Sequence, residues 1–174
     1  MAEGTREPPC YSIVEDETLE QGDILPYCPV FRPSSDIPFP FNPNVESPVE
    51  YAPQSVIVIS QSCDIRPHQK NVIHALLCSV VALSSTPYKN DMKALKANRI
   101  YHLHLLVDKC PCDPWKDEYL VVSFRDVWTL PLSFLMKFAA SLGPRLRLNH
   151  PYRENLSHQF GNYFSRVALP DELS

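Results

Sequence analysis

Residues 60–64 carry five consecutive hydrogen-bonding side chains, Ser-Gln-Ser-Cys-Asp, directly after the apolar segment 56–59. That segment, Val-Ile-Val-Ile, is β-branched at every position, which is typical of a strand buried on both faces. A strand held by packing fixes the side chains at its end while they face a loop, where functional sites are commonly built. We therefore expect the site here. The alternative is that Cys63 is a buried core residue and Asp64 only begins a turn.

The candidate catalytic residues are Cys63, Asp64 and His74. A cysteine attacks as its thiolate, and a cation such as Arg66 or His74 would favour that form, whereas Asp64 would oppose it. His74 lies within the next apolar segment, 71–83, and comes close to Cys63 if the two strands are antiparallel. Cysteine nucleophile chemistry is therefore one hypothesis for this stretch.

Nucleic-acid binding or cleavage is a second hypothesis. Guanidinium groups suit phosphate, and Asp64 with a histidine could serve as acid and base. The alternative is that the arginines form ion pairs with Asp126 and Glu154. The candidate substrate-binding residues are Ser60, Ser62, Arg66, Arg125, Arg145, Arg147 and Arg153.

Metal binding is a third hypothesis, and it would make the chain a zinc-stabilised structural domain. The soft ligands available are Cys63, Cys78, Cys110 and Cys112, with histidines. Cys110 and Cys112 are spaced as C-x-C, however, rather than as the C-x-x-C of a standard zinc module. His102 and His104 share one face of an expected strand and are expected to be solvated. We therefore assign no metal and no cofactor.

Composition favours one soluble domain. The chain has 174 residues, 44% of them hydrophobic, and no apolar run long enough for a membrane span or a signal peptide. We expect a cytoplasmic protein with reduced cysteines and no membrane partner. Acidic residues prevail over residues 1–50 and basic ones over 119–170, so the acidic half could meet a basic face of its own or a partner's chain. The candidate partners are RNA or DNA, a protein bound through the acidic half or the Pro-rich loop, and further copies of the same chain in a homo-oligomer.

The order of elements predicts an α+β fold. A polar N-terminal arm (1–18) precedes a single domain (19–170). A strand near 24–31 should lie at a sheet edge, because Pro26 and Pro29 cannot donate ladder hydrogen bonds. After this strand we expect a Pro-rich loop over 32–54, a short helix within 88–98, and strands over 56–59, 71–83, 99–107, 119–124 and 125–132. Two C-terminal helices should follow, and the first is capped by Ser133 and ended by Gly143. The second starts near 149–151 and presents Leu156, Phe160, Tyr163 and Val167 on one face. The architecture is a small SH3-like β-barrel or a curled antiparallel sheet with two C-terminal helices.

This order of features resembles the MazF/PemK-type toxin family over roughly residues 19–142. The matching segments are Gln21-Gly22-Asp23-Ile24, Val56 to Ser60, Ala75 to Cys78, and Tyr119 to Leu132. The resemblance implies an SH3-like barrel with attached helices and cleavage of RNA. The family uses a basic residue just before its second strand, whereas residues 51–55 here are Tyr-Ala-Pro-Gln-Ser, so its catalytic residues cannot be transferred. The chain is also similar to bacterial proteins with a Ser-x-Ser-Cys-Asp segment, which imply no activity.

Together these observations favour a toxin-like or nucleic-acid-processing domain, endoribonuclease-like and from a bacterial defence or toxin–antitoxin setting, acting around Cys63 and Asp64. The alternative is a non-catalytic protein-interaction module. The two hypotheses differ in whether these two side chains do chemistry.

Overall fold

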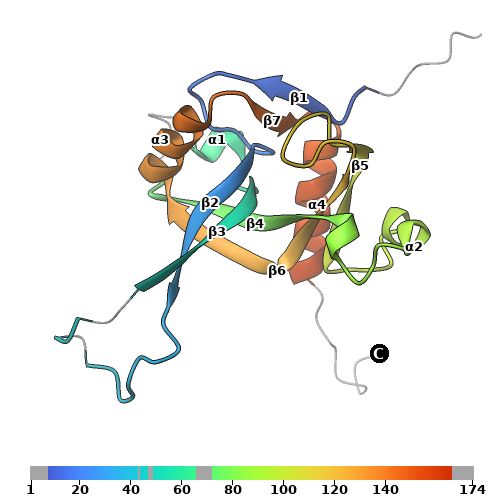
Figure 1. Cartoon of the computed structure of the whole chain (residues 1–174). Helices are drawn as coiled ribbons and strands as arrows, with labels where there is room; N and C mark the ends of the chain where they lie inside the picture. The colour runs from blue at the N-terminus through green and yellow to red at the C-terminus, as the bar shows by residue number, and fades with distance from the viewer. Residues whose placement is uncertain (1–7, 43, 47–48, 66–71, 166–174) are drawn as a thin grey trace, which may run out of the picture.

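The computed structural model describes residues 8–42, 44–46, 49–65 and 72–165. A five-stranded antiparallel sheet, in the order β2-β3-β4-β6-β5, is accompanied by a two-stranded sheet, β1-β7 (Figure 1). The strands are β1 (Tyr11–Val14), β2 (Ile24–Pro33), β3 (Val49–Val58), β4 (His74–Ala82), β5 (Leu103–Lys109), β6 (Tyr119–Pro131) and β7 (Arg145–Leu148). The helices are α1 (Ser62–Ile65), α2 (Met92–Lys96), α3 (Leu132–Leu142) and α4 (Tyr152–Phe164), with a 3-10 turn at Leu83–Ser85.

The mixed α+β fold with an antiparallel sheet and two late helices, α3 and α4, is confirmed. The sheet is open, because β2 and β5 form its two edges, so a closed SH3-like barrel is not confirmed. Strand β2 lies at an edge as predicted, and its register shifts between Leu25 and Cys28, around Pro26. None of the helices in the described residues has the length and apolar character that a membrane span requires.

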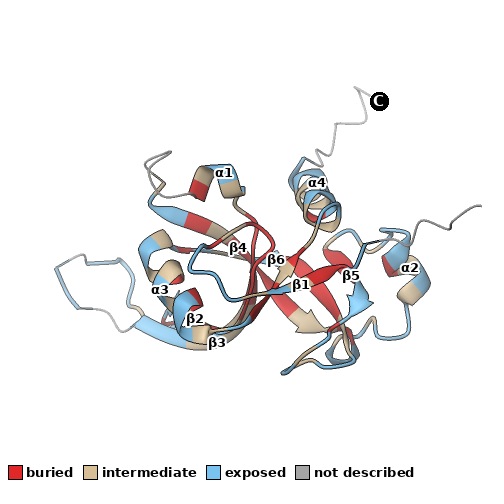
Figure 2. Cartoon of the chain, turned by 90° about the horizontal axis from the view of Figure 1, so that it is seen from above, coloured by how far each residue is buried: buried red, intermediate tan, exposed pale blue. Residues whose placement is uncertain are grey.

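The end of β3 is the centre of the fold. Val56, Ile57 and Val58 are fully buried. Val56 and Val58 belong to the core that α3 covers, whereas Ile57 belongs to the core that α4 covers. Figure 2 shows the buried residues gathered in the crossing strands between these two helices. The prediction of a strand buried on both faces is therefore confirmed.

The Pro-rich segment 32–54 is a loop only in part. Strands β2 and β3 continue into it from both sides, and Pro29 stands opposite Pro53 in their ladder. Alternate pairs of an antiparallel ladder exchange no hydrogen bonds, and two facing prolines fit such a pair. At the other end of the chain, the expected cap at Ser133 is wrong. Helix α3 already begins at Leu132, and its N-cap, Pro131, makes no side-chain cap bond.

The β1-β7 sheet, here called the ribbon, contains two strands that the sequence patterns did not predict. Strand β1 lies inside the segment expected to be a polar arm, and β7 lies where a loop before a helix was expected. The Leu148 N–H donates to the Gly22 carbonyl (3.0 Å) just before β2, and the Cys10 N–H donates to Asp108 Oδ2 (2.7 Å) in β5. The ribbon is thus attached to both edges of the open sheet.

Candidate functional site

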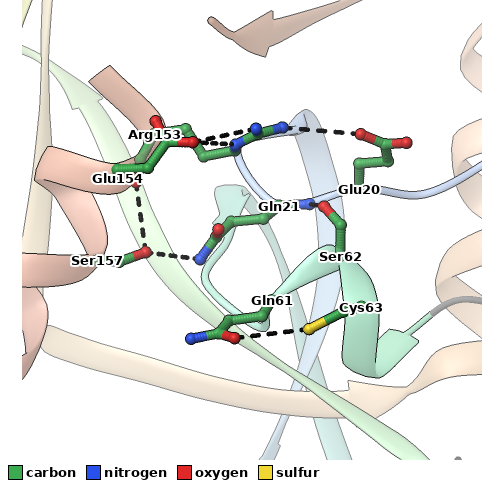
Figure 3. Close-up of a pocket in the computed structure, with 8 residues that line it drawn as sticks. All are labelled: Glu20, Gln21, Gln61, Ser62, Cys63, Arg153, Glu154 and Ser157. Atoms are coloured by element: carbon green, nitrogen blue, oxygen red, sulfur yellow. Dashed lines mark hydrogen bonds and ion pairs between the residues drawn. The ribbon is translucent and has the colours of Figure 1, made fainter. Parts of the chain in front are cut away.

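A pocket of about 390 Å³ opens between the turn before β2, helix α1 and the first turns of α4 (Figure 3). Ser62, Cys63 and Arg153, three of the residues predicted from the sequence, line it together. The other described lining residues are Glu20, Gln21, Gln61, Glu154 and Ser157. The end of β3 thus delivers Ser62 and Cys63 to an open concavity.

Gln21 fixes the walls of this pocket relative to one another. Its side-chain amide donates to the Ile59 carbonyl (2.7 Å) and to Ser157 Oγ (2.6 Å), while its backbone N–H donates to Ser62 Oγ (3.0 Å). The Ser157 hydroxyl donates in turn to the Arg153 carbonyl (3.3 Å). Gln21 is only 8% exposed, so it connects the end of β3, helix α1 and helix α4 beneath the surface of the pocket. Sequence reasoning missed it as a site residue, although it precedes the Gly22-Asp23 pair singled out for the first strand.

Cys63 is exposed, and its thiol points at acceptors. The sulfur lies 3.6 Å from Gln61 Oε1 and 3.7 Å from Asp64 Oδ1. Both oxygens are acceptors, and a thiol has a single hydrogen that it can donate to one of them at a time. In the described part of the chain no cation contacts this sulfur, whereas a nucleophilic cysteine needs a cation or base beside it. The contacts therefore favour a thiol that binds over a thiolate that attacks.

The remaining residues predicted for this site are scattered. His74 is exposed at the start of β4, opposite Pro131 of β6, and does not line the pocket. Ser60 Oγ accepts the Leu76 N–H (2.8 Å), which attaches the end of β3 to β4. Asp64 is half-buried in α1, and Arg66 lies outside the described residues.

The charged side of the pocket is an arginine between two carboxylates. Arg153 lies 3.1 Å from Glu154 Oε1 through Nη2 and 3.8 Å from Glu20 Oε2 through Nη1. Its side chain is 28% exposed, and that of Glu154 is 48% exposed. Partial burial would raise the pKa of Glu154, but a hydrogen bond from its own backbone and the contact with Arg153 lower it on balance. Glu154 is therefore ionised at neutral pH.

Arg145 and Arg147, predicted to bind phosphate, are committed to a buried ion-pair cluster. Arg145 Nε lies 3.0 Å from Asp23 Oδ2, and Arg147 binds both oxygens of Asp23 through Nε and Nη2. Both guanidinium groups also reach Asp16. Asp23 is fully buried, and the Arg145 side chain is 1% exposed. These two arginines therefore form ion pairs, as the alternative expected, but with Asp23 and Asp16 instead of Asp126 and Glu154. Glu154 does pair with another arginine of the predicted set, Arg153.

Arg125 lies apart from this set. It is exposed on β6 and is not among the pocket residues, and its neighbour Asp126 accepts a hydrogen bond from Ser123 Oγ (2.8 Å). Of the four predicted arginines that the structure describes, Arg125, Arg145, Arg147 and Arg153, only Arg153 lines this pocket. The arginines that the structure describes therefore do not form a continuous basic face at this pocket.

The cysteines weighed as zinc ligands are separated. Cys78 is buried in β4, Cys63 is exposed in α1, and Cys110 and Cys112 lie in the loop after β5. Within the ranges that the structure describes, no three His, Cys, Asp or Glu side chains gather as metal ligands. His104 is also not solvated as expected. It is 5% exposed and stacks on Phe124, and its Nδ1 has no hydrogen-bond partner in the described structure.

The pocket can bind a group through hydroxyl, thiol, amide and carboxylate contacts at one place. Its thiol contacts two acceptors, and its guanidinium is shared by two carboxylates. Comparisons with known protein families, curated proteins and solved structures find no match for this chain.

Proposed function

We propose that the chain is an interaction module whose protein partner inserts a cationic side chain, a lysine or an arginine, into the pocket at Ser62 and Cys63. The observation that supports this is the charge of the pocket. Two of its described lining residues, Glu20 and Glu154, are carboxylates, and Arg153 is the one cation among them. An incoming cation would pair with the more exposed of the two carboxylates, Glu154, whose side chain is 48% exposed.

Because the charged residues of the pocket are partly exposed, a partner's cation can replace an existing ion-pair contact with a small change in free energy. The side chains of Arg153, Glu154 and Glu20 are 28%, 48% and 22% exposed. Ion pairs at this level of exposure contribute about 1 kcal/mol or less, so a partner's cation can take over a carboxylate at little cost. The Ser62 hydroxyl and the exposed thiol of Cys63 add short-range contacts. Binding of this kind is expected to weaken as salt is raised.

The test is an NMR titration with two short peptides that differ only in a central lysine or glutamate. We expect the lysine peptide to shift the backbone signals of residues 20–21, 61–63 and 153–157, and Glu154→Gln to weaken its binding several-fold. Asp91→Asn is the matched control, because Asp91 is an exposed carboxylate outside the pocket. Equal or tighter binding of the glutamate peptide, or binding of neither, would overturn the proposal.

A nucleic-acid-processing activity at the same pocket is the second candidate. It is favoured by one observation, that Ser62, Cys63 and Arg153 of the predicted set line one pocket with two carboxylates that could act as acid and base. The RNA cleavage that the resemblance to MazF/PemK-type toxins implies is part of this second candidate. Cleavage of single-stranded RNA that is lost in folded Cys63→Ala and Arg153→Ala variants would support this candidate over the interaction module. Cleavage that persists in both variants would exclude the pocket as its site.

A further inference from the structure

Strands β2 and β3 extend past the rest of the sheet as a hairpin, here called the arm (described residues between 31 and 51). In the described ladder β3 pairs with β4 only at Val56–Val58, so its first residues have β2 as their neighbour. Figure 1 shows the arm projecting away from the body of the molecule. Most of its side chains are therefore presented to solvent, and at its base Phe31 lies edge-on to Phe134 of α3.

The arm is unusually apolar for a solvated segment. Phe39 is 86% exposed, Tyr51 71%, Phe41 56% and Phe31 51%, and Val45 and Val49 are also more than half exposed. At about 200 Å² for a whole aromatic side chain, the four rings expose roughly 500 Å². Apolar patches of that size are often functional, and a stable interface needs about 800 Å² from each partner. The arm thus offers much of what one side of an interface requires.

The arm is also acidic. It carries Asp36, Glu46 and Glu50 against one cation, Arg32. The Arg32 guanidinium is placed over the ring of Trp128, 4.8 Å from its centroid, on the body of the molecule. Two arms packed on each other would bring these carboxylates together, so a basic surface is the better counterpart.

A basic surface lies at the opposite end of the chain's fold. Here called the basic end, it consists of Lys89, Lys93, Lys96 and Arg99, in and around α2, with Asp91 as the acidic residue among them. All four cations are exposed, and none makes an ion pair with another residue in the described ranges. Figures 1 and 2 both place the arm and α2 at opposite ends of the molecule.

The basic end also has room for an aromatic ring. A second pocket, of about 400 Å³, lies beside α2 and is lined by Asn98, Tyr101 and three residues of α4. Those three are Gln159, Asn162 and Tyr163. Tyr101 is 60% exposed there, and the pocket's described lining carries no charged side chain. An aromatic side chain of the acidic arm would find apolar contact with the rings of Tyr101 and Tyr163, next to the cations of the basic end.

We propose that the arm of one copy docks on the basic end of a second copy, with Phe39 or Phe41 in the pocket beside Tyr101. Because arm and basic end lie at opposite ends of one molecule, the contact is between molecules and head-to-tail. A head-to-tail contact continues into a ring or a filament rather than stopping at a symmetric dimer. This association goes beyond the proposed function and does not depend on the pocket at Cys63.

Two variants that each lose one surface test the proposal by analytical ultracentrifugation. The arm variant is Phe39→Ser with Phe41→Ser, and the basic-end variant is Lys93→Glu with Lys96→Glu. We expect the wild type to associate beyond a dimer, less so at high salt, and each variant to associate at least about tenfold more weakly. An equimolar mixture of the two variants should form a 1:1 complex and nothing larger, because each supplies one intact surface.

The changes are all at exposed positions, and circular dichroism checks that both variants fold. Lys137→Glu is the matched control, since Lys137 is an exposed cation on α3 that belongs neither to the arm nor to the basic end, and this variant should associate like the wild type. Three results would overturn the proposal. The first is a wild type that stays monomeric at protein concentrations of hundreds of micromolar. The second is a basic-end variant that still self-associates, which would indicate arm-to-arm pairing. The third is an equimolar mixture of the two variants that forms no complex.

Discussion

Two groups of arginines and carboxylates, adjacent in the fold, differ in burial and therefore in role. Asp23 with Arg145 and Arg147 is enclosed between the ribbon and the sheet, and the Asp23 side chain is fully buried. Arg153 with Glu154 faces the open pocket, where the carboxylate is 48% exposed. The same pairing chemistry fixes the ribbon in one place and leaves exchangeable partners in the other.

The difference follows from solvation. A buried charge has lost its water, so removing its partner leaves an uncompensated ion, whereas an exposed charge is rehydrated when its partner leaves. Asp23 also accepts the Glu20 N–H (3.1 Å), so the buried cluster holds the turn on which the pocket is built. We infer that the cluster is the scaffold and the pocket is the site.

The largest expected effect comes from breaking the buried cluster. Asp23→Ala leaves two guanidinium groups without their central carboxylate and should lower the free energy of unfolding by about 3–5 kcal/mol. Urea denaturation measures this, with Asp91→Ala as the exposed control. A loss no greater than that of the control would mean that the cluster does not hold the ribbon.

His104, whose buried Nδ1 has no hydrogen-bond partner among the described residues, sharpens the comparison through pH. Burial lowers the pKa of His104 from its ordinary value of 6.5 to about 4. Between these two pH values the unfolded chain binds a proton that the folded chain does not, so stability is lost as the pH falls from 6.5 to 4, by about 3 kcal/mol from this residue. Urea midpoints across that range should show the loss. In His104→Phe, which keeps the stacking on Phe124, the loss should be smaller, and an identical profile would contradict the assignment.

The contact between the ribbon and the sheet depends on Gly22, which gives a third expectation. Its φ is +86°, and an added Cβ would lie 3.0 Å from Leu148 Cβ and 3.3 Å from the Leu148 nitrogen. Gly22→Ala should therefore destabilise by about 1–3 kcal/mol. Gly161→Ala is the control, since nothing lies within 4 Å of its added Cβ, and it should stabilise α4 slightly. Equal effects of the two changes on the thermal midpoint would refute the close approach.

The smallest effect should come from the pocket. Glu154→Ala removes an exposed partner of Arg153 and should change the free energy of unfolding by less than about 1 kcal/mol. Urea denaturation beside Asp23→Ala provides the direct comparison. A loss as large as that of Asp23→Ala would make the pocket part of the scaffold and remove the distinction drawn above.

Local patterns predicted the elements that build the walls of the site. The β-branched run 56–59 and the apolar stripe through Leu156 and Phe160 of α4 are readable because burial repeats with the period of the element. Strands β1 and β7 have four residues each, too few for a period, and the arginines of β7 look like a polar surface. The partnership of Asp23 with Arg147 spans 124 positions, which no local pattern encodes. The same limit applies to Gln21, whose Ser157 contact spans 136 positions.

The most direct test of the central claim uses Cys63 as a reporter in its own pocket. Cys63 is exposed, whereas Cys10, Cys28 and Cys78 are buried, and burial raises the pKa of their thiols to about 11, 12 and 12. Iodoacetamide should therefore alkylate Cys63 first in the native protein, as mass spectrometry of timed samples can show. We predict that the lysine peptide slows this labelling several-fold in the wild type and much less in Glu154→Gln, while labelling of the half-buried Cys112 is unchanged. A Cys63 labelling rate that the lysine peptide does not alter, or that the glutamate peptide lowers as much, would contradict the account.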